Sequence, residues 1–298
     1  MTADHNEGLA TAKIDAADLS IVIPFRHDRP ERLQNLTAVL HHLTATLAGV
    51  EIIVIEDGAQ IDGATLCAAL GLRHVAQPNP GAFHRTAILN HGIERLATRR
   101  FAASYDTDAL IYPAAWQQAL NLLRAGQTVV FPYGGRFCDV RGAFRARLLA
   151  HPDLALIPAA TAQAAPPKGS GDLVCINPNS VGGVVLFDRV TYAACGGYHE
   201  AFVAWGFEDA EIVARMTKLG QPFCRVADFP LIHLSHPRGR GRRAAAWYGA
   251  ARRNHALYRA MLRLSAADLT ALIAEGGLRG AAVSPKPGRL ATLFRRKV

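Results

Sequence analysis

The sequence has few cysteines and no apolar stretch long enough to cross a membrane. Its five cysteines are an odd number, lie far apart and form no C-x-x-C pair. This scarcity argues against a disulfide framework and a cysteine-rich zinc site, and it favours a reducing cytoplasm. The longest apolar runs, such as residues 19–25 and 52–55, have only the length of a buried strand. Residues 1–8 include acids and no apolar segment, so we expect no secretory signal.

Positive charge is concentrated at the C-terminal end. Residues 237–298 contain fourteen Lys and Arg against two acids, a net of +12, so the remaining chain carries about −3 of the total of +9. A basic amphipathic helix can lie on an anionic membrane surface, and this pattern is compatible with one. A solvated basic helix covering the core explains it equally well. Nucleic-acid binding is a third interpretation, which the nearly neutral remainder of the chain disfavours.

The chain alternates strand-like and helical segments, which predicts an α/β fold with a mainly parallel sheet flanked by helices. The predicted strands cover residues 19–25, 50–55, 72–76, 101–105, 128–133, 181–187 and 223–234. The predicted helices cover residues 30–47, 64–70, 84–98, 114–125 and 208–219, followed by a mostly helical basic tail. Residues 158–172 are rich in Ala, Pro, Gly and Ser, which predicts a mobile loop.

Polar residues follow three of the predicted strands. Arg26 follows the first, Asp57 the second, and Asp106-Thr107-Asp108 the strand at residues 101–105. Ligands of open α/β sheets bind at the carboxyl ends of the strands, so we expect these side chains to share a pocket. Asn79 to Arg85 opens a helix, and backbone N–H groups there, with Arg85, can meet a phosphate.

The D-x-D segment and two late histidines carry metal chemistry. Carboxylates at Asp106 and Asp108 can converge on one hard cation, although an Asp-rich turn is the plainer interpretation. His233 and His236 end the last predicted strand. One imidazole together with Asp108 would form a mixed nitrogen and oxygen site suited to Mn²⁺.

A third motif pairs an aromatic residue with acids. Trp205 and Gly206 precede Glu208 and Asp209, which begin a helix. Acids at a helix N-terminus interact favourably with the helix dipole, so capping alone explains them. Capping does not explain Trp205. We therefore predict that one acid is a general base for a sugar hydroxyl and that the indole stacks on the sugar.

Taken together, these segments resemble GT-A glycosyltransferases of the β-1,4-galactosyltransferase type, in the same order, over residues 19–240. The matching segments are Ile21-Val-Ile-Pro-Phe-Arg, Phe83-His-Arg, Asp106-Thr-Asp, Ser180-Val-Gly-Gly-Val, Trp205-Gly-Phe-Glu-Asp and His233-Leu-Ser-His. Ile55-Glu-Asp-Gly is more similar to the D-D-G segment of the family-2 transferases, which contacts the nucleobase. The resemblance implies a polar leader at 1–18, a GT-A domain at 19–236 with halves at 19–135 and 173–236, and a basic helical extension at 237–298.

The resemblance also implies a role for individual residues. Asp209 would be the catalytic base, with Glu208 beside it in the sugar site. The metal would be Mn²⁺ or another divalent cation, held by Asp108 and His236, with His233 as a further ligand. The residues implied to bind the donor are Pro24, Arg26, Asp57, Arg85, Asp106, Gly183 and Trp205.

Two positions depart from the pattern of that family. Phe207 stands where the family has glycine, which puts the shape of the acceptor pocket in question. Ser180 replaces a bulkier residue, and a smaller side chain there would admit a 2-acetamido sugar. The donor sugar is therefore either galactose or an N-acetylhexosamine.

The implied activity is inverting transfer of that sugar from a UDP-sugar to a hydroxyl of a glycan or lipid-linked acceptor, in surface polysaccharide biosynthesis. We expect the protein in the cytoplasm, with peripheral contact at the inner face of the membrane through its basic C-terminus. A metal-dependent nucleotidyltransferase is the main alternative, because it also places acids around a metal and a nucleotide. That class has no need of an aromatic residue beside the acids Glu208 and Asp209.

Overall fold

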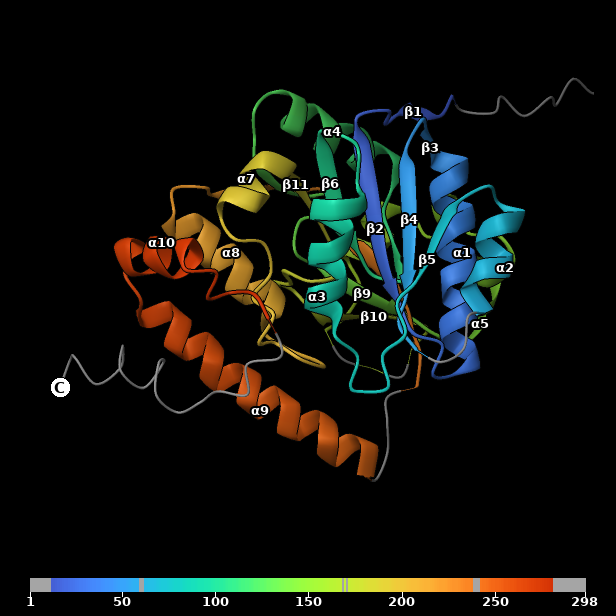
Figure 1. Cartoon of the computed structure of the whole chain (residues 1–298). Coiled ribbons are helices and arrows are strands. Elements are labelled where there is room, and N and C mark those ends of the chain that lie inside the picture. Colours follow the sequence, from blue (N-terminus) through green and yellow to red (C-terminus); the bar gives the residue numbers. More distant parts are fainter. Residues whose placement is uncertain (1–11, 59–61, 168, 170, 238–241, 281–298) are drawn as a thin grey trace, which may run out of the picture.

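A seven-stranded sheet forms the centre of the molecule, flanked by helices (Figure 1). The computed structural model describes residues 12–58, 62–167, 169, 171–237 and 242–280, with side chains of the last segment from residue 248 onward. The strand order is β12 (Phe223–Arg225), β8 (Val129–Phe131), β11 (Val184–Asp188), β6 (Phe101–Tyr105), β2 (Leu19–Phe25), β4 (Glu51–Glu56) and β5 (Arg73–Ala76). All strands run parallel except β11, which is antiparallel to both of its neighbours. The predicted mixed, mainly parallel sheet is confirmed.

The central strand β2 is buried along its whole length, as its apolar sequence predicts. It pairs with β4 throughout, whereas its pairing with β6 ends at Val22 and Ser104. Pro24 therefore lies beyond the stretch that is paired on both sides, and this is where a residue without an N–H is tolerated. The pairing of β2 with β6 thus ends before the carboxyl end of β2, which is followed by Arg26, the first of the predicted polar residues.

Helices cover the sheet and complete the α/β layers. They are α1 (Pro30–Thr46), α2 (Asp62–Ala69), α3 (Arg85–Asn90) continued by the π-helix η1 (His91–Leu96), α4 (Pro113–Arg124), α7 (Arg189–Ala194) and α8 (Glu208–Lys218). The η1 backbone lies close to the sheet, since a Cβ at Gly92 would lie 2.3 Å from a methyl group of Val22. Any larger side chain at that position would push the helix away from β2.

A second, four-stranded sheet joins distant parts of the chain. Its order is β10 (Leu173–Asn177), β9 (Phe137–Val140), β13 (Leu231–Leu234) and β7 (Ala109–Leu110). Strand β7 follows the D-x-D segment directly and is antiparallel to β13, with His233 opposite Ala109. This pairing brings the late histidines to the aspartates more than a hundred residues earlier.

The remaining elements lie at the margins of the two sheets. They are β1 (Ile14–Asp15), β3 (Leu47–Ala48), α5 (Gly142–Ala150), the 3₁₀-helix η2 (Leu154–Leu156) and α6 (Ala159–Gln163), and the C-terminal helices α9 (Arg242–Arg263) and α10 (Ala266–Ala274). The predicted basic helical extension at 237–298 contains α9 and α10, and α9 runs along the lower edge of the view (Figure 1). Residues 281–298 of this extension and residues 1–11 of the predicted polar leader lie outside the described residues. Within the described ranges, no helix combines the length and the apolar character that a membrane span requires.

Several local predictions were wrong. The single strand predicted at residues 223–234 is two strands, β12 and β13, which belong to different sheets. Pro230, which lacks an N–H, ends the connection between them. The segment 158–172, predicted as a loop, contains α6, and the helix predicted at 84–98 changes to π geometry at His91. Strands β9 and β10 and helices α5 and α7 were not predicted.

Candidate donor and metal site

The first polar cluster lies at the carboxyl ends of β2 and β4. Arg26 forms an ion pair with Asp57, and it also donates from Nε to the backbone carbonyl of Asp57 at 3.1 Å. Its Nη1 donates to the carbonyl of Gly81 at 2.9 Å, and its guanidinium lies 5.6 Å from the centre of the Phe83 ring. The backbone N–H of His84 donates to Asp57 at 3.3 Å. The two predicted donor-binding residues therefore hold the loop that leads into α3.

Arg85, the first residue of α3, is the centre of a second, buried cluster. Its Nη2 lies 2.9 Å from Oδ1 of Asp106, and its Nη1 lies 2.9 Å from Oδ1 of Asp209. It also donates to the hydroxyl of Ser104 at 3.2 Å. Burial raises the pKa of Asp106, as do the neighbouring carboxylates, while Arg85 opposes the shift. The guanidinium predicted to meet a phosphate thus links the D-x-D segment to Asp209, the predicted catalytic base.

Within the described part of the chain, the side-chain hydrogen bonds to Asp209 reach one of its two carboxylate oxygens. Arg85 and the hydroxyl of Tyr198, at 3.1 Å, both donate to its Oδ1. Its Oδ2 faces the backbone of Gly182, where an added Cβ would lie only 2.9 Å away. Glycine at this position therefore leaves space beside the second carboxylate oxygen.

Glu208 has an unusual environment for a carboxylate. It is buried, and its Oε2 has no hydrogen-bond partner among the described residues. Burial, followed by the negative charge of Asp209, raises the pKa of Glu208 to about 7, although Arg85 acts in the opposite direction. A carboxyl group with such a pKa can exchange a proton near neutral pH.

Trp205 stands out from this cluster as a half-exposed side chain, with 51% of its surface accessible. Its backbone carbonyl accepts a hydrogen bond from Nδ2 of Asn254, in α9, at 3.1 Å. Phe207 has a left-handed backbone with φ of 71°, and its ring stacks on those of His255 and Tyr258. The departure from glycine at this position therefore fastens the segment before α8 to the C-terminal helix.

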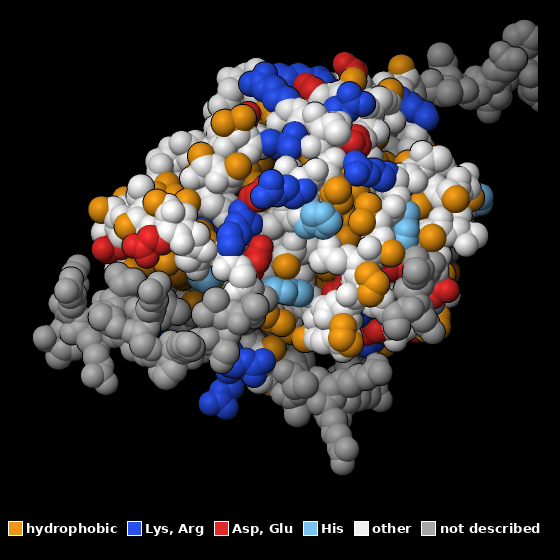
Figure 2. All heavy atoms as spheres, in the orientation of Figure 1, with side chains coloured by type: hydrophobic (Ala, Val, Ile, Leu, Met, Phe, Trp, Pro, Cys, Tyr) orange, Lys and Arg blue, Asp and Glu red, His pale blue; other side chains and the backbone are white. Residues whose placement is uncertain are grey.

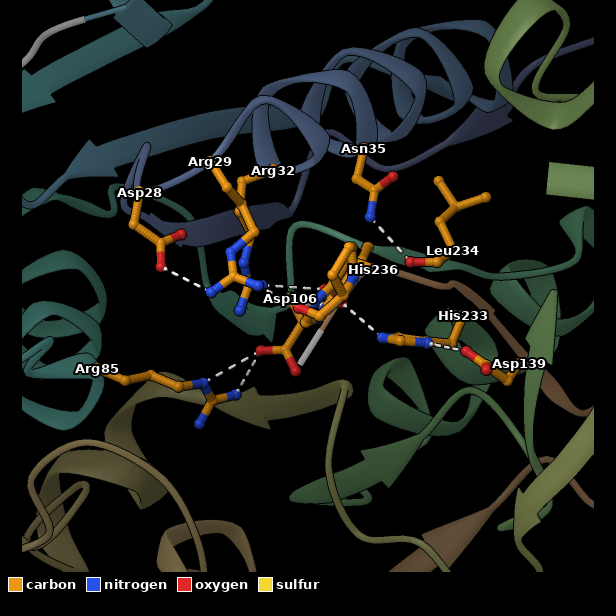
Figure 3. Close-up of polar contacts among 12 residues, drawn as sticks. Asp28, Arg29, Arg32, Asn35, Arg85, Asp106, Asp139, His233, Leu234 and His236 are labelled. Atoms are coloured by element: carbon orange, nitrogen blue, oxygen red, sulfur yellow. Dashed lines mark hydrogen bonds and ion pairs between the residues drawn. The ribbon is translucent and has the colours of Figure 1, made fainter. Parts of the chain in front are cut away.

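Asp108, His233 and His236 form a candidate metal cluster, with ligand atoms that all lie within 4.8 Å of one another. Nε2 of His236 lies 3.3 Å from Oδ2 of Asp108, and Nε2 of His233 lies 3.6 Å from Oδ1 (Figure 3). Neighbouring ligands of one cation are about 3 Å apart, because each metal–ligand bond is about 2 Å long. One carboxylate and two imidazoles thus fit a divalent cation of borderline character, such as Mn²⁺.

Positive side chains surround Asp108. Nη1 of Arg32, in α1, donates to Oδ2 of Asp108 at 3.1 Å. Burial alone would raise the pKa of Asp108, but His233, His236 and Arg32 together bring it well below its usual value. Burial lowers the pKa of His233, whereas Asp108 and Asp139 outweigh this effect and raise it to about 9. Asp108 is therefore ionised in its pocket and stabilised by the neighbouring side chains.

Two of the predicted donor-binding residues have a backbone function. Gly183 has φ of 88°, and its carbonyl accepts from the N–H of Asp106 at 2.8 Å. Pro24 lies in β2, opposite Ile55 of β4. Both residues act through their place in the backbone, and neither contributes a polar side chain to the site.

Three residues of the clusters were missed in the sequence. Arg32 and Tyr198 contact Asp108 and Asp209, and Asp139 accepts a hydrogen bond from His233. The one signal for Asp139 is its charge within the short apolar segment Phe137–Val140. Arg32 carries no such signal, because a polar residue at a helix start is common. Tyr198 follows Gly196 and Gly197, and this segment is not explained by capping of the next helix.

Comparisons with known proteins give a family match for one segment and a similar fold for most of the chain. Residues 176–237 match the family described as the N-terminal domain of galactosyltransferase. The fold is similar to that of GalNAc-T7 crystallised with UDP, GalNAc and Mn²⁺, with a TM-score of 0.54 and 14% identity over 82% of this chain and 47% of that chain. None of the curated protein sequences matches the chain.

Two further structures show lower scores. The catalytic domain of Drosophila β-1,4-galactosyltransferase 7 with xylobiose has a TM-score of 0.44 and 16% identity, over 77% of this chain and 79% of that one. Glucosyl-3-phosphoglycerate synthase from Mycobacterium tuberculosis has a TM-score of 0.48 and 17% identity, over 88% and 81%. The chain has the GT-A glycosyltransferase fold, and it resembles the galactosyltransferase family in the segment that carries Trp205, Asp209 and both histidines.

Proposed function

We propose that the protein is a metal-dependent glycosyltransferase that moves a sugar from a UDP-sugar to a hydroxyl group of a glycan acceptor. The observation that carries this proposal is the junction of two clusters at one edge of the sheet. Asp108, His233 and His236 form a cation site, and Asp106, two residues before Asp108, joins Arg85 and Asp209. A donor diphosphate on the cation would therefore place its sugar near a carboxylate.

The galactosyltransferase match supports the same activity. It covers the segment that supplies Gly183, Trp205, Asp209 and both histidines. The fold neighbour GalNAc-T7 was crystallised with UDP, GalNAc and Mn²⁺, so this fold accommodates a nucleotide and a cation. Mn²⁺ bound to Asp108, His233 and His236 would supply positive charge for the leaving diphosphate.

In the proposed mechanism, Oδ2 of Asp209 takes the proton of the acceptor hydroxyl. The oxygen of the acceptor hydroxyl then attacks the anomeric carbon while the bond from this carbon to the UDP oxygen breaks, which inverts the configuration. Arg85 and Tyr198 hold Oδ1 of Asp209, so the carboxylate is oriented before the substrate arrives. Arg26 and Asp57 hold the nucleotide end, and Trp205 offers its exposed indole to a sugar face.

The nature of the sugar depends on the loop before β11. Ser180 is buried, and its hydroxyl accepts from the N–H of Gly182 at 3.2 Å. The small side chain is thus folded into the loop rather than filling the sugar site. We propose a donor with galactose or an N-acetylhexosamine.

For the acceptor, we propose a sugar carried on a membrane lipid during surface polysaccharide assembly. Helix α9 has no acidic residue, and its Arg252, Arg253, Arg259 and Arg263 are exposed. Figure 2 shows basic side chains projecting from the lower edge of the molecule, where α9 lies in Figure 1. The same helix holds the carbonyl of Trp205 through Asn254, so a bilayer against α9 would lie near the acceptor side. The protein would then work in the cytoplasm, at the inner face of the membrane.

A panel of UDP-sugars tests this function. Each sugar is added with Mn²⁺ to the wild-type protein and to Asp108→Ala, and thermal stability and slow donor hydrolysis are measured. We expect one UDP-sugar to stabilise the wild type only when Mn²⁺ is present, and Asp108→Ala to lose the effect. No response to any UDP-sugar would refute the proposal, and release of pyrophosphate from a nucleoside triphosphate would favour a nucleotidyltransferase instead.

A further inference from the structure

A second buried carboxylate lies behind the metal cluster, on the far side of His233 from Asp108. Asp139 is only 4% exposed, and its Oδ1 lies 2.7 Å from Nδ1 of His233. The other ring nitrogen, Nε2, faces Oδ1 of Asp108 at 3.6 Å. Figure 3 shows the imidazole of His233 with Asp139 on one side and His236 towards the other.

The backbone fixes this arrangement. Strands β9 and β13 are parallel neighbours, and His233 is the direct register partner of Asp139. Oδ2 of Asp139 accepts from Nε of Arg141 at 2.7 Å, so both carboxylate oxygens are engaged. The imidazole also lies 5.0 Å, centre to centre, from the ring of Phe137, which limits its rotation.

Such a contact decides which nitrogen of a histidine is available to a cation. An imidazole that donates its Nδ1–H to a carboxylate has its lone pair on Nε2, and this partner also makes the ring a better ligand. Among the described residues, no carboxylate contacts Nδ1 of His236, which faces the carbonyl of Pro237 at 3.2 Å. His233 is therefore the more firmly oriented of the two histidines.

We propose that Asp139 is a positioning residue that makes His233 a cation ligand through Nε2, so that the site presents one carboxylate and two imidazoles. This inference rests on the proposed function, which requires a cation at Asp108. Imidazole nitrogens favour borderline cations such as Mn²⁺, Co²⁺ and Zn²⁺, whereas Mg²⁺ prefers oxygen ligands. The site should consequently discriminate against Mg²⁺ more strongly than a site made of carboxylates alone.

The test measures cation binding to the full-length protein without nucleotide. Mn²⁺ and Mg²⁺ are titrated into the EDTA-treated wild type, Asp139→Asn, His233→Gln and the double variant. Loss of an outer partner of a ligating histidine weakens metal binding by about 10- to 100-fold, and we expect this loss for Mn²⁺ in Asp139→Asn. His233→Gln, which removes the ligand itself, should lose at least as much. The double variant should lose no more than His233→Gln alone, because Asp139 acts through His233.

A matched control and a spectroscopic readout separate positioning from folding. Asp172→Asn removes a carboxylate that accepts from the N–H of Ala143 and has no contact with the histidines, so it should bind Mn²⁺ like the wild type. Pulsed electron paramagnetic resonance of bound Mn²⁺ counts the nitrogen ligands, and the count should fall from two to one in Asp139→Asn. Melting of each metal-free variant shows whether it is folded.

The outcomes distinguish this inference from the proposed function. Wild-type Mn²⁺ affinity and two nitrogen ligands in Asp139→Asn, with UDP-sugar turnover intact, would overturn the role of Asp139 and leave the function standing. Additive losses in the double variant would also overturn it. A wild-type protein that binds no divalent cation would refute the proposed function itself.

Discussion

The stability of Glu208→Gln, relative to that of the wild type, should increase as the pH rises from acidic to alkaline values. Glu208 is buried, its Oε2 has no partner among the described residues, and Asp209 is adjacent. Burial, and then Asp209, raises its pKa from 4.5 to about 7. Folding therefore favours the protonated form, and the wild type is penalised as the pH rises from 4.5 towards the folded pKa.

The magnitude follows from the size of the pKa shift. One pKa unit corresponds to about 1.36 kcal/mol, so a shift from 4.5 to about 7 costs the ionised wild type about 3 kcal/mol. Most of this penalty, roughly 2 to 3 kcal/mol, develops between pH 5 and pH 8, because the unfolded glutamate is already largely ionised at pH 5. Glu208→Gln has no such titration, so its stability relative to the wild type should rise by that amount.

Urea unfolding in the presence of EDTA measures this difference. The free energy of unfolding is determined for the wild type and Glu208→Gln at several pH values between about 5 and 8, so that other titrating groups cancel in the comparison. Glu275→Gln, at an exposed position after α10, is the control and should track the wild type at every pH. A difference in free energy of unfolding between Glu208→Gln and the wild type that stays constant with pH would refute the reasoning. A difference that decreases as the pH rises would show that the effect has the opposite sign.

Three further predictions concern the metal site, the donor loop and the C-terminal helix. Arg32→Gln should bind Mn²⁺ several-fold more tightly in calorimetric titration, because Arg32 occupies Oδ2 of Asp108, and weaker binding would contradict this view. Gly183→Ala should lower the free energy of unfolding by about 2 kcal/mol or more, since φ is 88° and the Cβ would lie 2.7 Å from Leu231. Gly276 has φ of 69°, and a Cβ added there would meet no described atom within 4 Å, so Gly276→Ala should lose only the backbone cost of about 1 kcal/mol. Equal losses of unfolding free energy in Gly183→Ala and Gly276→Ala would show that the contact with Leu231 is unimportant. Replacing the exposed arginines of α9 by glutamine should release the protein from anionic vesicles in a sedimentation assay, while neutral vesicles should bind neither form; unchanged binding would exclude α9 as the contact. The arginines are Arg252, Arg253, Arg259 and Arg263.

Much of the main sheet could be predicted because its signals are local. Strand β2 is an apolar run interrupted only by Ser20, and α1 begins with proline and has regularly spaced apolar residues. The rule that polar residues gather at the carboxyl ends of parallel strands then placed Arg26, Asp57 and Asp106 on one edge. These predictions needed no knowledge of which strands are neighbours beyond their parallel direction.

The second sheet could not be predicted in this way. Strand β7 has two residues and β9 has four, and both are too short for alternation to distinguish them from loops. The hydrogen bond between His233 and Asp139 joins residues that are 94 positions apart, and it depends on the parallel register of β9 and β13. No spacing rule links two such residues in a single sequence.

The position of the metal cluster follows from this small sheet rather than from the D-x-D segment alone. The N–H of Leu234 donates to the carbonyl of Asp108 at 2.7 Å, and Nδ2 of Asn35, in α1, donates to the carbonyl of Leu234 at 2.8 Å. The backbone between the two histidines is thereby bound to Asp108 on one side and to α1 on the other. A D-x-D turn without this strand would present a carboxylate to solvent, where a cation is held weakly. The pairing with β13 brings the imidazoles to the buried carboxylate, and in the proposed function this combination would make Asp108 a specific metal ligand instead of an acidic turn.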